Sequence, residues 1–185
     1  MEKELVILTE SDKNGGYCVA GIDIHSGRWI RLVSGDEDTD GALTVNDLTY
    51  RNKKMCSVLD IVIVQLVQDC GTSIQPENYL INRKYYLEKT GTYELEDVCK
   101  IHAPEEFEYI LGKNKGHYVT AECVRNAGGI SLVLVRVKDL CIHKEEDKWK
   151  ADFIYRGVNY KKFSVTEKSI IVEDSFHVIS MWKVV

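Results

Sequence analysis

Hydrophobic residues form short runs or alternate with polar ones through most of residues 1–90, and both patterns indicate β-strands. Leu5–Leu8 predicts a short buried strand that ends in the polar turn Glu10–Gly16. Two more strands follow at Tyr17–Ile22 and Arg28–Val33, separated by the turn His25–Gly27. The chain therefore begins with a predicted three-stranded meander.

A central strand and one short helical turn are predicted next. Thr44 is placed to cap a turn of helix over Val45–Leu48. Asp60–Leu66 is apolar on both faces, as a strand in the middle of a sheet would be. Pro76 has no N–H group to donate, so Gln75–Ile81 is predicted to be an edge segment or a loop.

The period changes to helical spacing in the middle of the chain. Leu95–Cys99 follows i, i+3, i+4 spacing, and a second helix is predicted from Pro104 to the glycine cap at Gly112. A third short helix is predicted over His117–Cys123. Residues 91–129 are therefore expected to be a helical connecting segment.

The last part of the chain is predicted to be all strand. The predicted strands are Ser131–His143, Trp149–Arg156, Tyr160–Thr166 and Phe176–Val184, with a charged hairpin turn at Lys144–Lys148. Two β meanders thus flank a helical middle, and such short strands with few prolines favour two small barrels over one sandwich.

The predicted fold is mainly β with a helical middle segment and two small barrels packed together. The first barrel is assigned to residues 1–90, the helical segment to 91–129 and the second barrel to 130–185. Hydrophobic residues make up 44% of the chain and charged residues 29%, which are ordinary values for a globular protein.

Charge and targeting signals narrow the class of protein. The net charge of −5 excludes a surface that binds polyanions everywhere, so any nucleic-acid site must be local. The apolar runs Ile61–Val64 and Leu132–Val135 are too short to cross a membrane, and the N-terminal residues lack the apolar core of a secretory signal. The six cysteines form no C-x-x-C pair, so most are expected to be buried thiols in a cytoplasmic protein.

Catalytic motifs are missing from the sequence. It contains no G-x-S-x-G, H-E-x-x-H, G-x-G-x-x-G or G-x-x-x-x-G-K-[ST] motif. No residue is therefore assigned a catalytic or metal-binding role, no cofactor is expected, and a non-enzymatic binding protein is favoured over an enzyme.

Two groups in the first barrel are candidate ligand-binding residues. Trp29 and Arg31 share one strand face, where an indole stacks on a base and a guanidinium grips a phosphate; alternatively, Trp29 is a core residue and Arg31 pairs with a carboxylate. Gln75, Glu77 and Asn78 surround a proline, and their donors and acceptors suit either a ligand or the backbone of a barrel mouth.

The second barrel offers a stripe of aromatic residues and a positive spot. Trp149, Phe153 and Tyr155 share one strand face, which serves either as a stacking platform or as the buried face of the strand. Arg156, Lys161 and Lys162 lie around the following hairpin, where they either bind an anion or are simply solvated. Tyr155, Arg156 and Lys161 join the candidate ligand-binding residues.

Several segments together resemble the bacterial dual OB-containing domain family, where OB denotes an oligonucleotide-binding-type barrel. The matching segments are Tyr17–Gly21, Gly27–Ser34, Asp60–Val62, Gln75–Asn78, Phe153–Gly157, Tyr160 and Ser164–Thr166. The resemblance implies two OB-type barrels and at most a nucleic-acid or nucleotide-recognition role, with no catalytic residues. The chain departs from the family at Val165–Lys168, where Val-Thr-Asp-Pro is expected.

Two functions from different classes follow. The first is a binding module for single-stranded nucleic acid or a nucleotide-like ligand, with Trp29, Arg31 and the segment Gln75–Asn78 in contact with it. The alternative is a protein-interaction or adaptor module, which the acidic net charge and exposed strand edges would suit.

Overall fold

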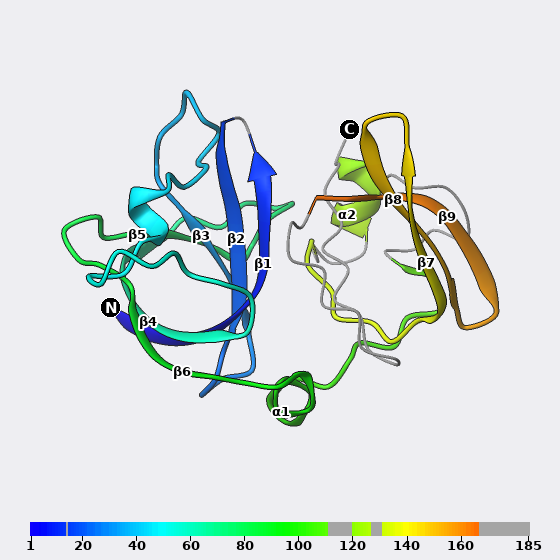
Figure 1. Ribbon diagram of the computed structural model, residues 1–185, viewed down its shortest axis with the longest axis horizontal. Helices are drawn as coiled ribbons and strands as arrows, with labels where there is room; N and C mark the ends of the chain where they lie inside the picture. Colours follow the sequence, from blue (N-terminus) through cyan, green and yellow to red (C-terminus); the bar gives the residue numbers. More distant parts are fainter. Residues whose placement is uncertain (14, 111–119, 127–130, 167–185) are drawn as a thin grey trace. The chain divides into compact units, whose positions relative to one another are not determined.

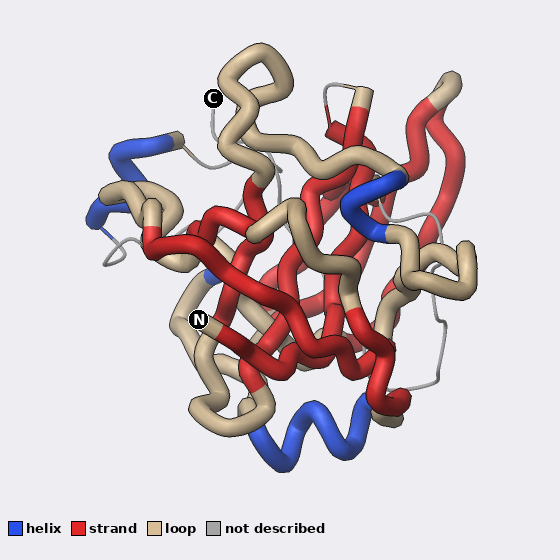
Figure 2. Tube along the Cα trace, turned by 90° about the vertical axis from the view of Figure 1, so that its left-hand side faces the viewer, coloured by secondary structure: helices blue, strands red, loops and turns tan. Residues whose placement is uncertain are grey.

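The computed structural model describes residues 1–185 except 14, 111–119, 127–130 and 167–185 (Figure 1). The described residues form two compact units. The N-terminal unit comprises Met1–Thr72 and Glu77–Ala103, and the C-terminal unit comprises Ser73–Pro76 and Pro104–Thr166. Strands far outweigh helices among the described residues (Figure 2), so the prediction of a mainly β fold is confirmed, although its helical middle segment is minor.

Five strands of the N-terminal unit close into a barrel. They are β1 (Glu2–Lys13), β2 (Gly16–Asp23), β3 (Trp29–Val33), β4 (Asp60–Asp69) and β5 (Asn78–Ile81). Their order is β1-β2-β3-β5-β4, and β4 pairs in turn with β1 to complete the ring. The β3–β5 pair is parallel, whereas the other pairs of the ring are antiparallel.

Strand β1 pairs with β4 along one edge and with β2 along the other. Residues 2–6 pair with β4 and residues 5–13 pair with β2, with an irregularity in register between Ile7 and Thr9. The strand continues to Lys13, so the predicted turn at Glu10–Gly16 is too long. At Gly21 of β2 an added Cβ would lie 2.2 Å from the carbonyl oxygen of Val6, so only glycine fits the closely approaching β1 backbone.

Alternate residues of the barrel strands fill its interior. Leu5, Ile7, Val19, Ile30, Leu32, Val62, Val64, Leu66 and Ile81 belong to one buried cluster. The 3₁₀ helix η1 (Asn46–Leu48) adds Leu48 to this cluster. The N-cap of this turn is Val45 and not the predicted Thr44, but the Thr44 hydroxyl does accept a hydrogen bond from the Asp47 N–H group at 3.3 Å.

Strand β6 (Glu88–Thr92) and helix α1 (Leu95–Ile101) follow the ring. β6 pairs with the first residues of β4, on the same edge whose last residues pair with β5. β6 is the last strand in the sheet order. The helix confirms the spacing read at Leu95–Cys99, and its residue Val98 is buried.

The second predicted helix is wrong over residues 104–109. Residues 104–109 contain no helix, although Pro104 and the acidic residues after it favour a helix start. The Glu105 N–H group donates to the Leu134 carbonyl at 2.7 Å, and the Phe107 N–H group donates to the Tyr155 hydroxyl at 2.8 Å. Because these N–H groups donate to residues distant in sequence, the segment is irregular and its helical propensity is overridden.

A helix and a three-stranded sheet build the C-terminal unit. Helix α2 (Ala121–Asn126) overlaps the end of the third predicted helix, whose residues 117–119 lie outside the described residues. Strands β7 (Lys138–Glu145), β8 (Lys148–Tyr155) and β9 (Val158–Val165) pair antiparallel in that order. The predicted strand Phe176–Val184 also lies outside the described residues.

The core of the C-terminal unit combines the sheet with an irregular segment. Residues 131–137 are not a strand, which corrects the predicted strand from Ser131, yet Val133, Val135 and Val137 are buried beside Phe153. Ile74 from the short segment Ser73–Pro76 packs against the same cluster. Apolar burial alone therefore does not require strand pairing here.

No helix in the described part of the chain has the length and apolar character that crossing a membrane requires. The five cysteines whose side chains are described carry thiols, and two of them, Cys18 and Cys56, are buried.

Candidate functional site

The predicted site residues of the N-terminal unit are mostly buried. The Trp29 ring is partly buried, with its centroid 5.6 Å from that of His102 in an edge-to-face arrangement. Arg31 is only 2% exposed and forms an ion pair with Glu77, whose residue is also buried. The Arg31 Nη1 group also donates to the Asn78 side-chain oxygen at 3.4 Å. The structure thus brings Arg31, Glu77 and Asn78 together as a polar cluster at the β3–β5 seam.

This cluster joins β3 to the start of β5, which are neighbouring strands of the barrel. The Arg31 N–H group donates to the Glu77 carbonyl at 2.7 Å, which adds a main-chain bond to the ion pair. Burial lowers the pKa of the Arg31 guanidinium, and the Glu77 charge opposes that shift. The arrangement is the alternative considered for Arg31, in which it pairs with a carboxylate.

The remaining predicted site residues belong to the C-terminal unit. Tyr155 is a core residue whose hydroxyl also donates to the Phe107 carbonyl at 3.0 Å. Arg156 is exposed and lies 3.3 Å from the Glu106 carboxylate, while Lys161 is exposed on β9. Gln75 is partly buried in the segment Ser73–Pro76.

The outward face of β2 and β3 is buried as well as their inward face. Cys18, Ala20 and Ile22 point away from the barrel interior together with Arg31, and each of the four is at most 5% exposed. Barrels of the OB type commonly use this strand pair to bind ligands. In this chain these four side chains are not available to a ligand from solution.

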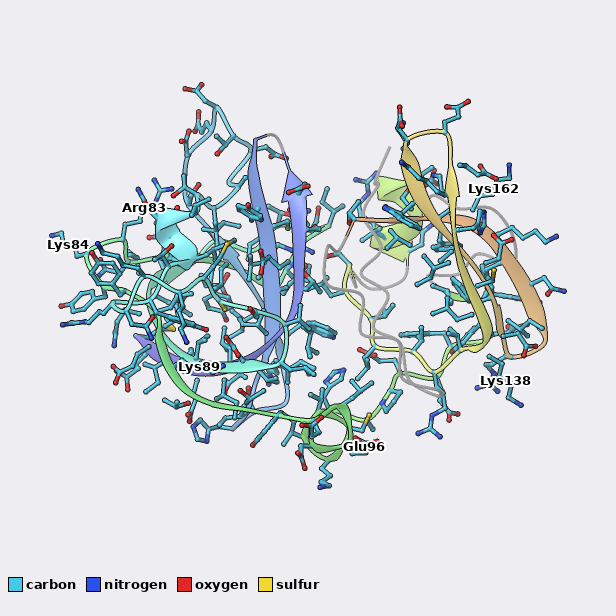
Figure 3. All side chains as sticks on the ribbon, in the orientation of Figure 1. Arg83, Lys84, Lys89, Glu96, Lys138 and Lys162 are labelled. Atoms are coloured by element: carbon cyan, nitrogen blue, oxygen red, sulfur yellow. The ribbon has the colours of Figure 1, made fainter. Side chains whose placement is uncertain are left out.

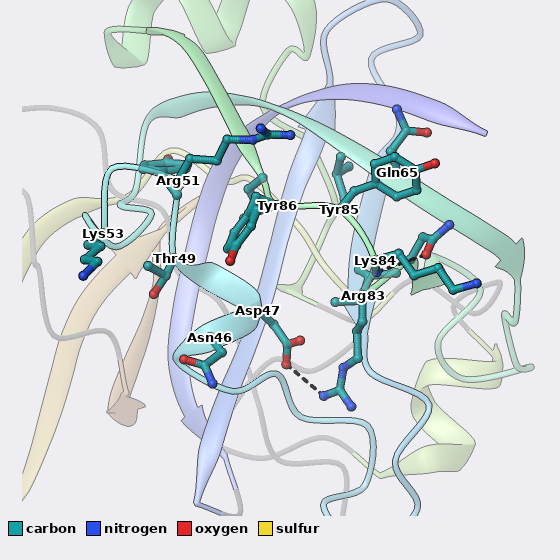
Figure 4. A pocket seen from close by; sticks show the side chains of 15 residues that line it. Asn46, Asp47, Thr49, Arg51, Lys53, Gln65, Arg83, Lys84, Tyr85 and Tyr86 are labelled. Carbon is teal, nitrogen blue, oxygen red and sulfur yellow. Dashed lines mark hydrogen bonds and ion pairs between the residues drawn. The ribbon is translucent and has the colours of Figure 1, made fainter.

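An open pocket lies instead at one end of the barrel, next to η1 (Figure 4). Its volume is about 700 Å³, within the range of small-ligand sites. It is bounded by η1 and the following turn, by Val64 and Gln65 of β4, and by the connection Ile81–Leu87 between β5 and β6. All of these residues belong to the N-terminal unit.

Exposed aromatic rings and cations line this pocket together. Tyr85 and Tyr86 are 60% and 57% exposed, and both are adjacent in the lining. The cationic lining residues are Arg51, Lys53, Arg83 and Lys84, whereas Asp47 is the one carboxylate among the described lining residues. We call these six aromatic and cationic residues, with the cavity they surround, the aromatic-basic pocket.

The turn at Tyr50–Lys54 presents the first two cations. The Tyr50 N–H group donates to the Lys54 carbonyl at 2.8 Å, and the Lys53 N–H group donates to the Tyr50 carbonyl at 2.9 Å. Lys53 has a φ of 65°, a left-handed conformation that a lysine holds only where its surroundings impose it. The Arg51 guanidinium carbon lies 6.0 Å from the centre of the Tyr86 ring, at cation–π distance.

The connection between β5 and β6 presents the other two cations. The Tyr85 N–H group donates to the Asn82 carbonyl at 3.1 Å, and the Lys84 N–H group donates to the Asn82 side-chain oxygen at 3.2 Å, which fixes a turn. Arg83 is anchored by an ion pair of 2.8 Å with Asp47 (Figure 4). Arg83 and Lys84 both project from the surface of the unit (Figure 3).

A buried polar network supports the lining residue Tyr50. Its hydroxyl donates to Asp60 at 2.7 Å, and Asp60 also forms an ion pair with Lys89. Burial, reinforced by the neighbouring Cys56 and Asp60, raises the pKa of the Tyr50 phenol. Burial likewise raises the pKa of the Cys56 thiol to about 12, so this cysteine stays neutral and is a poor nucleophile.

None of the eight predicted site residues lines the described part of this pocket. Its signal was nonetheless present in the sequence as two basic runs, Arg51–Lys54 and Arg83–Tyr86, the second of which ends in two tyrosines. Interleaved basic and aromatic residues are typical of nucleic-acid contacts. The net charge of the whole chain does not reveal these basic runs, because acidic residues elsewhere offset their positive charge.

Metal binding has no cluster to support it in the described residues, where no group of three or more His, Cys, Asp or Glu side chains converges. The side chains of the aromatic-basic pocket offer aromatic faces, cations and hydrogen-bonding groups.

Comparison with known proteins agrees with the barrel topology. A family model described as the dual OB-containing domain matches residues 3–179. No curated protein and no solved structure matched the chain. Because the family model covers nearly the whole sequence, the chain belongs to the dual OB-containing domain family.

Proposed function

We propose that this protein is a binding module for single-stranded nucleic acid or a nucleotide-like ligand, and that the ligand occupies the aromatic-basic pocket. Membership of a family of OB-containing domains supports a binding role in general, since barrels of this kind commonly bind oligonucleotides or oligosaccharides. Fold alone does not choose the ligand, so the choice depends on the chemistry of the pocket.

One observation carries the proposal: two exposed tyrosines lie among four cations in a chain whose net charge is −5. Stacking of one base on an aromatic ring contributes about 1–3 kcal/mol, and every base has a face to offer. Exposed arginine and lysine side chains contact phosphates without needing a particular base. The local positive charge supports the proposal, because a nucleic-acid site in a chain of this net charge would have to be confined to one place.

The test is fluorescence anisotropy with labelled single-stranded RNA and DNA at low salt. The double variant Tyr85→Ala/Tyr86→Ala is expected to weaken binding about tenfold or more through loss of stacking. Val67→Ala is the control, because it removes another half-exposed apolar side chain of the N-terminal unit that does not line the pocket. Anisotropy that stays flat for the unaltered protein, or equal affinities for the tyrosine variant and the control, would refute the proposal.

A protein-interaction role is the second candidate, and the place of β6 favours it. β6 ends the sheet order, so its outer edge is positioned to accept a strand from a partner. Its exposed Glu88 and Lys89 discourage unspecific strand pairing and would select a partner of complementary charge. Pull-down with nuclease treatment separates the two candidates. A protein partner that stays bound after nuclease treatment, but does not bind the Thr90→Pro variant, supports strand addition.

A cytoplasmic location stays a prediction from the sequence.

A further inference from the structure

The cations of the aromatic-basic pocket form two pairs on different turns. Arg51 and Lys53 come from the turn after η1, and Arg83 and Lys84 come from the connection between β5 and β6. In Figure 4 Lys53 lies to one side of Tyr86 and Arg83 and Lys84 lie to the other, while Arg51 reaches over the ring, with its guanidinium carbon 6.0 Å from the ring centre. The positive charge is therefore split between two turns that both lie near the Tyr86 ring.

Hydrogen bonds within the protein hold the backbone of both turns. Hydrogen bonds within each turn fix the backbone that carries the cations, at Tyr50–Lys54 and at Asn82–Tyr85. Asp47 also accepts hydrogen bonds from the Thr44 N–H and hydroxyl groups, each at 2.8 Å, so Arg83 is anchored on a carboxylate that is itself fixed. The spacing of the two pairs is thus a property of the fold, which lowers the entropic cost of binding.

A split arrangement suits some phosphate ligands better than others. A nucleoside triphosphate carries all of its phosphates at one end, so with its base on a tyrosine it reaches one pair of cations at a time. A single strand carries phosphates on both sides of each internal base, so it places one phosphate near each pair while that base stacks on Tyr86.

Resting on the function proposed above, we infer that the aromatic-basic pocket selects an internal stretch of single-stranded nucleic acid over free nucleotides. Arg51 and Lys53 contact the phosphate on one side of a base that stacks on Tyr86, and Arg83 and Lys84 contact the phosphate on the other side. The site distinguishes a continuous strand from a free nucleotide but shows little preference among bases, because neither stacking nor phosphate contacts distinguish the four bases strongly.

Competition binding tests this inference. A labelled single-stranded hexanucleotide is displaced by a nucleoside monophosphate, a nucleoside triphosphate or a tetranucleotide. The triphosphate and the tetranucleotide carry similar charge, so they differ chiefly in how that charge is distributed. The tetranucleotide is expected to compete at least about tenfold better than the triphosphate.

Two paired variants locate the residues that bind phosphate. Arg51→Gln/Lys53→Gln and Arg83→Gln/Lys84→Gln are each expected to weaken hexanucleotide binding and to reduce the slope of log K against log salt by about 0.7 for each phosphate that is no longer neutralised. The control Lys138→Gln/Lys148→Gln changes the net charge equally at exposed positions of the C-terminal unit and should leave binding unchanged. Unfolding midpoints of all three variants confirm that the fold is retained.

The outcomes separate the two proposals. If the triphosphate competes as well as the tetranucleotide, or if only one cationic pair matters, the pocket binds nucleotides and the preference for a strand is overturned while the proposed function stands. If none of the nucleotides or oligonucleotides binds, the proposed function falls and the inference falls with it. Displacement of the hexanucleotide by an acidic peptide with equal potency would also overturn the inference.

Discussion

Replacing Glu77 with glutamine removes the carboxylate that accompanies a buried guanidinium, and the expected loss of stability follows from the surroundings of Arg31. Arg31 is 2% exposed, so water does not compensate for a missing partner. Breaking a buried ion pair on one side costs about 3–5 kcal/mol, mainly because a charge is left without compensation. Domains of this size are stable by about 5–15 kcal/mol, so Glu77→Gln should remove a large fraction of the stability of the N-terminal unit.

Urea unfolding followed by tryptophan fluorescence measures the effect, and Trp29 reports on the strand concerned. With a slope of about 2 kcal/mol per molar urea, a loss of about 3 kcal/mol lowers the midpoint by about 1.5 M. The matched control is Glu106→Gln, which removes the partner of Arg156 in an exposed pair and should cost less than about 1 kcal/mol.

A double variant distinguishes an unpaired charge from poorer packing. Arg31→Met/Glu77→Leu replaces the pair with apolar side chains, and it should be less destabilised than the sum of its single changes by about 2 kcal/mol. If Glu77→Gln shifts the midpoint no more than Glu106→Gln does, the reasoning from burial is wrong. The same result would return Arg31 to consideration as a ligand-binding residue.

Three further predictions concern other parts of the fold. Gly21→Ala places a methyl group 2.2 Å from the Val6 carbonyl oxygen, so the unfolding free energy should fall by about 1–3 kcal/mol; an unchanged melting temperature would contradict the close approach. The pKa of Cys56 is raised from 9.0 to about 12, so the unfolded state loses this proton first as pH rises. Stability should therefore fall between pH 9 and 12 by about 1.4 kcal/mol per pH unit more than in Cys56→Ala, and parallel pH profiles of the two proteins would exclude this contribution. Tyr155→Phe removes the hydroxyl that accepts from the Phe107 N–H group at 2.8 Å, which should cost about 1–3 kcal/mol in denaturant unfolding of the C-terminal unit; a cost near zero would mean that another group replaces it.

Strand periodicity predicted the N-terminal unit well because its interior is lined by alternate residues. The runs at Leu5–Leu8, Tyr17–Ile22 and Asp60–Leu66 each lie within an observed strand. Ladder bonds and burial favour the same conformation in these segments, so local pattern and global fold agree. The extension of β1 to Lys13 was missed because a hairpin ladder tolerates the polar residues that also favour turns.

Prediction failed where tertiary contacts replaced local preferences. Pro104 and its acidic neighbours favour a helix start, but the backbone of Glu105 and Phe107 bonds to Leu134 and Tyr155 instead. Such partners are distant in sequence, and no periodicity reveals them. The apolar run from Ser131 likewise indicated burial correctly and strand pairing wrongly.

The candidate site was missed for a different reason. The residue types of Trp29 and Arg31 suit ligand recognition. Whether such side chains contact a ligand or are buried within the protein depends on their exposure, which the sequence does not show. Arg31 is buried and pairs with Glu77, which is distant in sequence. The basic runs beside Tyr85 and Tyr86 were readable in the sequence, but their joining into one pocket required the closed barrel.

The placement of Ile74 has a consequence for how this protein can be divided. This residue lies in the chain between β4 and β5 of the barrel, yet it packs in the core of the C-terminal unit. A cut near residue 90 would therefore give an N-terminal fragment with a superfluous apolar side chain and a C-terminal fragment with an incompletely filled core. Recombination or domain shuffling near residue 90 is therefore expected to separate Ile74 from the core that it packs against.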